Sequence, residues 1–291
     1  MDRTQAVACC LSAALLAGCS GGRSAIVVAS KNFTEQIVLG EIVAQHLERR
    51  LRVPVDRRLN LGGTLLAHQA LVAGQIDLYP EYTGTALTAI LKLPPAPEPG
   101  AVLAGVRAAY RPLGLEWMPP LGFSNGFAMV IRGPEARAHG IASLSDAARY
   151  RPGWVLGAGY EFTSRPDGLP ALLRTYHLPL QGAPKSMDLG LLYRALEQGE
   201  VTMAAGNETD GMLRALDVRV LQDDRRAFPP YDAALVVRAA ALAAHPGLRE
   251  ALGELSGKFS VAAMQELNAA VDGAHKPVAE VAGDFLRRAG L

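Results

Sequence analysis

Cysteine is missing from the chain beyond residue 19. The three cysteines are Cys9, Cys10 and Cys19. The rest of the chain can therefore form no disulfide, no thiolate metal site and no cysteine nucleophile. Its stability must come from a hydrophobic core, and residues 20–291 are enough for one large or two medium domains.

The sequence also lacks an excess of either charge and any long apolar run after residue 19. Its 29 Lys and Arg residues are balanced by 28 Asp and Glu residues. No basic surplus is available to attract nucleic acid, so we expect no nucleic-acid partner. No later segment reaches the ~18 uninterrupted apolar residues of a membrane-spanning helix. A hydrophobic content of 49% with 20% charged residues is typical of a globular protein.

Motifs of enzymes and cofactor-binding proteins are missing as well. No glycine-rich phosphate loop ends in Lys-Ser/Thr, and no Gly-x-Gly-x-x-Gly follows a predicted strand. The six histidines are scattered without metal-ligand spacing. A Gly-x-Ser-x-Gly match at residues 18–22 does not lie on a strand-to-helix turn and is a chance match. We therefore expect no catalytic residues, no metal and no cofactor. The alternative is that the chain is a periplasmic enzyme.

The first 19 residues are typical of a bacterial lipoprotein signal peptide. Arg3 precedes an apolar run at residues 6–17, and the segment ends in Leu-Ala-Gly-Cys at Cys19. Such a run fits a signal sequence and is too short to span a bilayer. The last four residues resemble a lipobox, which predicts lipidation of Cys19. Acyl chains would anchor a soluble body to a bacterial membrane, facing the periplasm or the cell exterior. An ordinary secretory signal is the alternative.

Alternating strand and helix patterns predict an α/β fold. Residues 25–29 form a β-branched run, and residues 38–47 carry apolar side chains at helical spacing. Further strands are expected at residues 53–61 and 76–79. This order of elements predicts a parallel sheet with helices packed on it.

Two proline pairs predict that one domain is inserted in another. A second αβ series begins after Pro119-Pro120, and Pro229-Pro230 precedes a returning strand. Lobe 1 would comprise residues 20–121 and 231–291, and lobe 2 residues 122–230. Two lobes joined by two crossings can hinge, and a ligand in the cleft favours closure. One large sheet is the alternative.

Residues 79–91 give the first indication of function. They read Tyr-Pro-Glu-Tyr-Thr-Gly-Thr-Ala-Leu-Thr-Ala-Ile-Leu and follow a predicted strand. Tyrosine rings and threonine hydroxyls are thus expected at the edge of a sheet where open α/β proteins bind small molecules. A tyrosine face suits a quaternary ammonium cation, which cannot donate a hydrogen bond. A β-α turn with a packed aromatic ring is the alternative.

Several motifs together resemble those of a known family. They are Ser-Lys-Asn-Phe-Thr-Glu-Gln at residues 30–36, Leu-Asn-Leu-Gly-Gly-Thr at residues 59–64, and Asp-Leu-Tyr-Pro-Glu-Tyr-Thr-Gly-Thr-Ala at residues 77–86. With residues 164–168 and 209–211, they resemble the substrate-binding proteins of glycine betaine/carnitine/choline ABC importers, in particular the osmoprotectant-uptake branch. The resemblance implies a two-lobed periplasmic binding protein fold with a ligand cleft between the lobes.

The same resemblance implies an aromatic cage for a trimethylammonium group and polar groups for a carboxylate. Tyr82 and Tyr193 match cage tyrosines, whereas Lys31, Thr85 and Arg165 match carboxylate-holding positions. Arginine offers a planar fork to a carboxylate, and a helix N-terminus follows Lys31 and also favours an anion. The alternatives are a surface ion pair for Arg165 and a solvated loop lysine for Lys31.

Two positions depart from the family pattern. Phe127, two positions after Asn125, stands where the family often has tyrosine, so the ring remains without its hydroxyl. Asn207 stands where the family often has a cage tyrosine before Ser/Thr-Thr-Asp, and the carboxylate of Glu208 follows it. Losing one desolvated cation–π contact of about 2 kcal/mol would weaken binding of a simple betaine by roughly tenfold or more. Alternatively, Asn207 and Glu208 bind a bulkier trimethylammonium compound such as ergothioneine or carnitine.

The sequence thus predicts a lipid-anchored, monomeric receptor without catalytic activity. It would bind a quaternary ammonium compound, glycine betaine or a related osmoprotectant, and deliver it to the permease and ATPase subunits of an ABC importer. A domain that senses the ligand and signals to a partner is the alternative.

Overall fold

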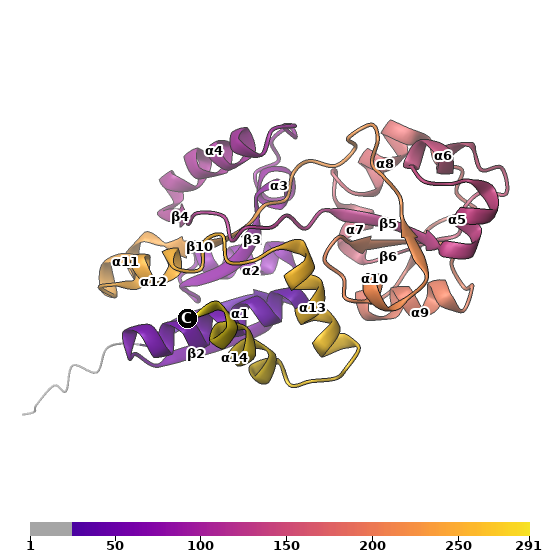
Figure 1. The fold of residues 1–291 in the computed structure, drawn as a ribbon. Helices are drawn as coiled ribbons and strands as arrows, with labels where there is room; N and C mark the ends of the chain where they lie inside the picture. The colour runs from indigo at the N-terminus through magenta and orange to yellow at the C-terminus, as the bar shows by residue number, and fades with distance from the viewer. Residues whose placement is uncertain (1–24) are drawn as a thin grey trace, which may run out of the picture.

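The structure is a computed structural model that describes residues 25–291. The predicted signal peptide, with its lipobox and Cys19, lies outside the described residues. Residues 25–291 form two α/β lobes, each built around a five-stranded sheet (Figure 1). The prediction of a two-lobed α/β fold is therefore confirmed, and the alternative of one large sheet is wrong.

The sheet of lobe 1 has the strand order β2-β1-β3-β10-β4. Its strands are β1 (Ile26–Lys31), β2 (Val55–Gly62), β3 (Leu78–Tyr82), β4 (Leu115–Trp117) and β10 (Ala233–Arg238). β1 pairs in parallel with β2 and β3, as the β-α-β-α-β pattern predicts, whereas β10 is antiparallel to both β3 and β4. The late strand β10 therefore completes a sheet that the N-terminal part of the chain begins.

Helices cover both faces of this sheet. They are α1 (Thr34–Leu51), α2 (Thr64–Val72), α3 (Thr83–Thr85), the π-helical turn η1 (Ala86–Ile90), α4 (Pro99–Tyr110), the 3₁₀ turn η2 (Arg111–Leu113), α11 (Ala239–Ala244), α12 (Leu248–Gly253), α13 (Val261–Asp272) and α14 (Val278–Ala289). Successive residues of β1 point to opposite faces: Val28 packs in the core under α1, and Ala29 in the core under α2 and α4. α1 buries Val38, Leu39 and Ile42 completely, so its predicted apolar face is the one that packs on the sheet.

The sheet of lobe 2 has the strand order β7-β6-β8-β5-β9. Its elements are β5 (Phe127–Arg132), α5 (Gly133–His139), α6 (Leu144–Arg149), β6 (Leu156–Ala158), α7 (Tyr160–Ser164), α8 (Leu169–Tyr176), β7 (Lys185–Ser186), the 3₁₀ turn η3 (Leu189–Leu191), α9 (Leu192–Glu197), β8 (Met203–Asn207), α10 (Met212–Ala215) and β9 (Val218–Val220). Met203 and Ala204 of β8 belong to different cores, so this sheet is also buried on both faces.

Two segments cross between the lobes, residues 118–126 and 221–232, and they lie side by side. The Asn125 N–H donates to the Tyr231 carbonyl at 3.1 Å, and the Ala233 N–H donates to the Phe123 carbonyl at 3.0 Å. The predicted boundaries at residues 121/122 and 230/231 fall in these segments; the division they make stays a prediction. α13 also reaches lobe 2, where Asn268 donates to the Thr209 carbonyl at 2.9 Å.

Among the residues described, none of the helices has the length and apolar character that crossing a bilayer requires.

Candidate functional site

A cavity of about 850 Å³ lies between the two lobes, at the ends of strands from both sheets. In lobe 1, β1 ends at Lys31 and β3 ends at Tyr82; in lobe 2, β8 ends at Asn207. Strand ends of α/β sheets are the usual place for a small-molecule site. The predicted ligand residues that line the cavity are Lys31, Tyr82, Thr85, Asn125, Phe127, Arg165 and Asn207. Tyr193 and Glu208 do not line it.

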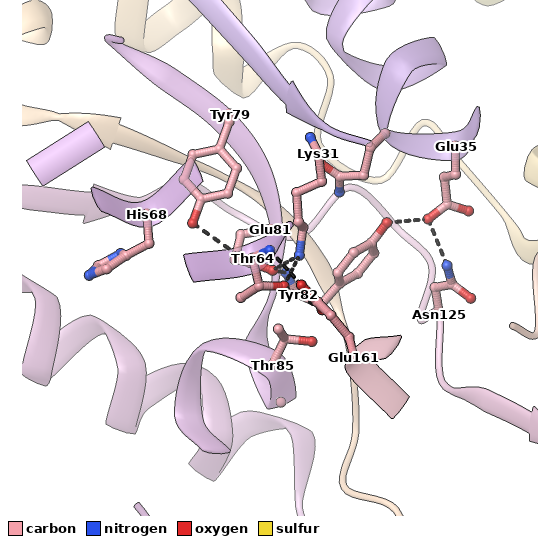
Figure 2. Close-up of polar contacts among 12 residues, drawn as sticks. Lys31, Glu35, Thr64, His68, Tyr79, Glu81, Tyr82, Thr85, Asn125 and Glu161 are labelled. Atoms are coloured by element: carbon pink, nitrogen blue, oxygen red, sulfur yellow. Dashed lines mark hydrogen bonds and ion pairs between the residues drawn. The ribbon is translucent and has the colours of Figure 1, made fainter. Parts of the chain in front are cut away.

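Contacts with Glu35 and Phe33 orient the Tyr82 ring. Its hydroxyl donates to Glu35 Oε1 at 2.5 Å, and Asn125 Nδ2 donates to the same oxygen at 2.9 Å (Figure 2). The ring stacks on Phe33 with 6.4 Å between centroids. Burial raises the pKa of Glu35 above its ordinary value. One buried carboxyl group therefore orients the tyrosine and the amide of Asn125, both of which line the cavity.

Phe127, at the start of β5, is the centre of a second aromatic cluster at the cavity. Its ring centroid lies 4.9 Å from that of Phe162, 5.5 Å from Phe228 and 5.6 Å from Tyr231. Phe162 and Tyr231 also line the cavity. Sequence reasoning missed both residues. Tyr231 directly follows Pro229-Pro230, a signal that indicated a domain crossing but not that the crossing supplies a wall of the site.

Lys31 is buried, with 3% of its surface exposed, so the alternative of a solvated loop lysine is wrong. Its Nζ lies 2.5 Å from Glu81 Oε1 and 3.4 Å from Thr64 Oγ1. It also lies 4.8 Å from the centroid of the Tyr82 ring. Glu81 is fully buried. The positive charge of Lys31 is therefore already matched by a carboxylate of the protein.

Arg165 forms a bidentate pair with Asp167, with Nη2–Oδ2 at 2.5 Å and Nε–Oδ1 at 3.0 Å. The arginine side chain is only 11% exposed, so the pair is buried rather than on the surface. Arg165 Nη2 also donates to Thr85 Oγ1 at 3.1 Å, which joins lobe 2 to lobe 1. Burial would raise the pKa of Asp167, but Arg165 and the hydroxyl of Tyr231 bring it below its ordinary value. Arg165 Cζ lies 5.1 Å from the centroid of the Phe127 ring.

Glu161, which sequence reasoning missed, contributes a further carboxylate to the cavity wall. Its Oε1 accepts from the Thr64 N–H at 2.6 Å, and its Oε2 accepts from the Thr64 hydroxyl at 2.9 Å. Burial would raise the pKa of Glu161, but Lys31, both Thr64 donors and Arg165 outweigh it and lower the pKa. The Thr64 motif gave no sign of this partner, because Glu161 is 97 positions later and comes from the other lobe.

Comparison with known proteins shows which family the chain belongs to. The model of a family described as the substrate binding domain of an ABC-type glycine betaine transport system matches residues 24–288. The chain belongs to this family. The resemblance seen in the motifs is therefore confirmed, and the chain is a solute-binding protein of a transport family.

Two relatives are each 34% identical in sequence to this chain. One is the glycine-betaine-binding protein of Pseudomonas aeruginosa, with 99% of this chain and 95% of the relative covered. The other is the ergothioneine transport permease/ergothioneine binding protein EgtU of Helicobacter pylori, with 91% of this chain covered. This chain spans only 48% of that relative's length. A solved structure of a glycine betaine/carnitine/choline ABC transporter matches with a TM-score of 0.76, 29% identity, 90% of this chain and 98% of that chain.

Tyr193 and Asn207 share Asp210 as a hydrogen-bond partner. Tyr193 is buried behind the cavity, and its hydroxyl donates to Asp210 Oδ2 at 2.8 Å. The Asn207 N–H donates to the same oxygen at 2.8 Å, and Asn207 Nδ2 donates to Oδ1 at 3.3 Å. Glu208 turns away and accepts from the Gly126 N–H at 3.1 Å. Of these side chains, Asn207 alone is in the cavity lining.

No group of three or more His, Cys, Asp or Glu side chains within residues 25–291 is arranged to hold a metal ion.

Proposed function

We propose that this protein is the binding subunit of an ABC importer and captures a quaternary ammonium compound, glycine betaine or a related osmoprotectant, between its lobes. The observation that carries the proposal is the set of aromatic side chains from both lobes that line one cavity: Tyr82 and Phe33 from lobe 1, Phe127 from lobe 2, and Tyr231 from the crossing segment. Ring faces attract a cation that cannot donate hydrogen bonds. The family match and the relative from Pseudomonas aeruginosa support the same ligand class.

A ligand screen by thermal shift tests this function. Glycine betaine, choline, carnitine and ergothioneine each carry a trimethylammonium group, and glycine serves as the control because it keeps the carboxylate but lacks the methyl groups. A ligand at 100 times its dissociation constant raises the free energy of unfolding by about 2.7 kcal/mol. We expect at least one trimethylammonium compound, and not glycine, to raise the melting temperature. If none of the four does so, the proposal is wrong.

A bulkier trimethylammonium ligand is the second candidate, and the size of the cavity favours it. A volume of about 850 Å³ is in the upper part of the roughly 300–1,000 Å³ range of small-molecule sites. The amide of Asn207 adds a polar group to the wall. The relative from Helicobacter pylori is named for ergothioneine. Tighter binding of ergothioneine than of glycine betaine in the same screen would support this candidate.

The remaining parts of the proposal concern partners and place. A lipid anchor on Cys19 would hold a monomer outside the cytoplasm, where it delivers its ligand to a permease and ATPase without catalysing a reaction. The lipobox and the family match support this arrangement. An acyl mass on Cys19 and recovery in the membrane fraction are the expected results. A soluble protein without acyl chains would contradict the anchor.

A further inference from the structure

The cavity contains a carboxylate that belongs to the protein itself, that of Glu161. Glu161 comes from α7 in lobe 2 and reaches the start of α2 in lobe 1. There its two oxygens contact the two donors of Thr64, the N–H at 2.6 Å and the hydroxyl at 2.9 Å. The first N–H groups of a helix have no partner within the helix and carry partial positive charge, so they favour an anion. Glu161 thus takes up donors that a ligand carboxylate would otherwise use.

The cationic groups around Thr64 also converge on Glu161. Lys31 Nζ lies 3.4 Å from Thr64 Oγ1, and Arg165 Nη1 lies 3.6 Å from Glu161 Oε2. Figure 2 shows Lys31, Thr64, Glu81 and Glu161 meeting at one point beside Tyr82. Lys31 and Arg165 are the residues that the family resemblance assigns to a ligand carboxylate. The protein's own carboxylate is therefore in the place where that of a zwitterionic ligand is expected.

The balance of charge points the same way. Lys31 is paired with the buried Glu81, and Arg165 with the buried Asp167. Both cations near Glu161 are therefore already paired with other carboxylates. Together the two cations, their two partners and Glu161 carry one net negative charge. The exposed side chains of Lys92 and Asp188, which also line the cavity, add one charge of each sign. A ligand carboxylate entering this site meets like charge, whereas a ligand with only a positive charge does not.

We propose that Glu161 is a specificity-determining residue: its carboxylate occupies the subsite for a ligand carboxylate and so disfavours zwitterionic betaines relative to quaternary ammonium cations without a carboxylate. The inference rests on the proposed function, since it concerns the choice of ligand within that cavity. A zwitterion must displace Glu161 from both Thr64 donors before its own carboxylate can bind. A cation such as choline binds with the Glu161–Thr64 contact intact.

Glycine betaine and choline form a suitable pair of probes. Both have a trimethylammonium group on a two-carbon chain, and they differ in that one chain ends in a carboxylate and the other in a hydroxyl. Glu161→Gln keeps the size of the side chain and an oxygen that can accept from Thr64, but removes the charge. Glu197→Gln is the matched control, because Glu197 is exposed at the end of α9 in the same lobe.

Calorimetry of both ligands with wild type, E161Q and E197Q tests the inference. A charged hydrogen bond affects an equilibrium by roughly tenfold or more. We therefore expect the ratio of affinities to shift toward glycine betaine by about tenfold or more in E161Q, and to stay at the wild-type value in E197Q. Glu161→Asp, which keeps the charge but is one methylene shorter and cannot keep both Thr64 contacts, should give a smaller shift in the same direction.

The outcomes separate the inference from the function on which it rests. If both ligands bind and the ratio in E161Q and E161D equals that in wild type, Glu161 does not determine specificity, and the proposed function stands. A shift of the ratio toward choline in E161Q contradicts the inference as well. If neither ligand nor any other trimethylammonium compound binds to any of the proteins, the proposed function is wrong and the inference with it.

Discussion

Tyr82 lines the cavity with its ring, while its hydroxyl donates to the buried carboxyl group of Glu35. The same oxygen of Glu35 accepts from Asn125, which lies 90 positions later in the chain. At the scale of single residues, side chains that contact a ligand depend on a buried partner that does not. Orienting a ring in advance lowers the entropy lost on binding.

Glu35 makes stability depend on pH. Burial raises the pKa of Glu35 in the folded protein above its ordinary value of 4.5, so the folded state holds a proton that the unfolded state releases. The free energy of unfolding therefore falls as pH rises from about 4.5 through the raised pKa. Glu35→Gln can still accept from Tyr82 and Asn125, so we expect it to raise the free energy of unfolding at pH 7 by on the order of 1 kcal/mol. Urea unfolding at pH 4 and pH 7 checks this, and the gain at pH 4 should be smaller. An equal gain at both values would contradict the assignment.

Asn207 is the residue whose replacement distinguishes the two candidate ligands. Asn207→Tyr adds a ring to the cavity wall, so glycine betaine should bind about five- to thirtyfold more tightly, the effect of one cation–π contact of ~1–2 kcal/mol. Ergothioneine should bind less tightly, since the ring fills space and the amide is lost. Calorimetry with both ligands and both proteins measures this. If N207Y binds each ligand with the same affinity as wild type, Asn207 does not contact the ligand.

At the scale of elements, α7 and the turn after it carry side chains of lobe 2 that contact lobe 1. This short helix carries Glu161 to Thr64, and the turn carries Arg165 to Thr85. Asp167 follows and accepts from the hydroxyl of Tyr231 at 2.7 Å. One stretch of eight residues from Tyr160 to Asp167 therefore supplies the cation, its buried partner and the interlobe carboxylate.

The Arg165–Asp167 pair gives a prediction about stability. Arg165→Ala would leave the buried carboxylate of Asp167 without its cation, which should lower the free energy of unfolding by about 3 kcal/mol. Adding Asp167→Asn should recover much of this loss, because no uncompensated charge remains. The control is Arg137→Ala: Arg137 and Asp217 also form a close bidentate pair, but both side chains are more than half exposed. Its unfolding midpoint should hardly change. An equal loss in both single variants would contradict the argument from burial.

Elements that depend on local sequence were predicted well. β1, α1 and the returning strand β10 lie where apolar periodicity indicates them, and Lys31 and Tyr82 lie in motifs at the ends of strands. The two-residue strand β7 and three-residue strand β9 show no period of their own and exist through pairing with β6 and β5. Glu161 and Tyr231 were missed for the same physical reason. Their roles arise only when segments about 100 or more positions apart pack together, which local patterns do not encode.

At the scale of the whole molecule, two adjacent crossing segments join the lobes, and lobes joined in this way can hinge about such segments. Gly84 in α3 lies against the second segment: a Cβ atom there would be 2.4 Å from the Pro230 carbonyl oxygen and 2.8 Å from the Tyr231 ring. No side chain fits without a shift of the backbone. The glycine therefore allows lobe 1 to hold Tyr231 at the cavity wall.

Replacing Gly84 with alanine should displace the crossing segment and move the Tyr231 ring away from Phe127. We expect Gly84→Ala to lower the free energy of unfolding by about 1–3 kcal/mol, as overpacking does. Ligand affinity should also fall, because the aromatic wall is no longer aligned. Gly100→Ala is the matched control: Gly100 lies in α4 with nothing within 4 Å of its added Cβ, so alanine should be neutral or slightly stabilising. Thermal unfolding and calorimetry with the ligand from the screen measure both effects. A G84A variant with wild-type stability and affinity would show that the crossing segment moves freely, and that the position of Tyr231 does not depend on its contact with lobe 1.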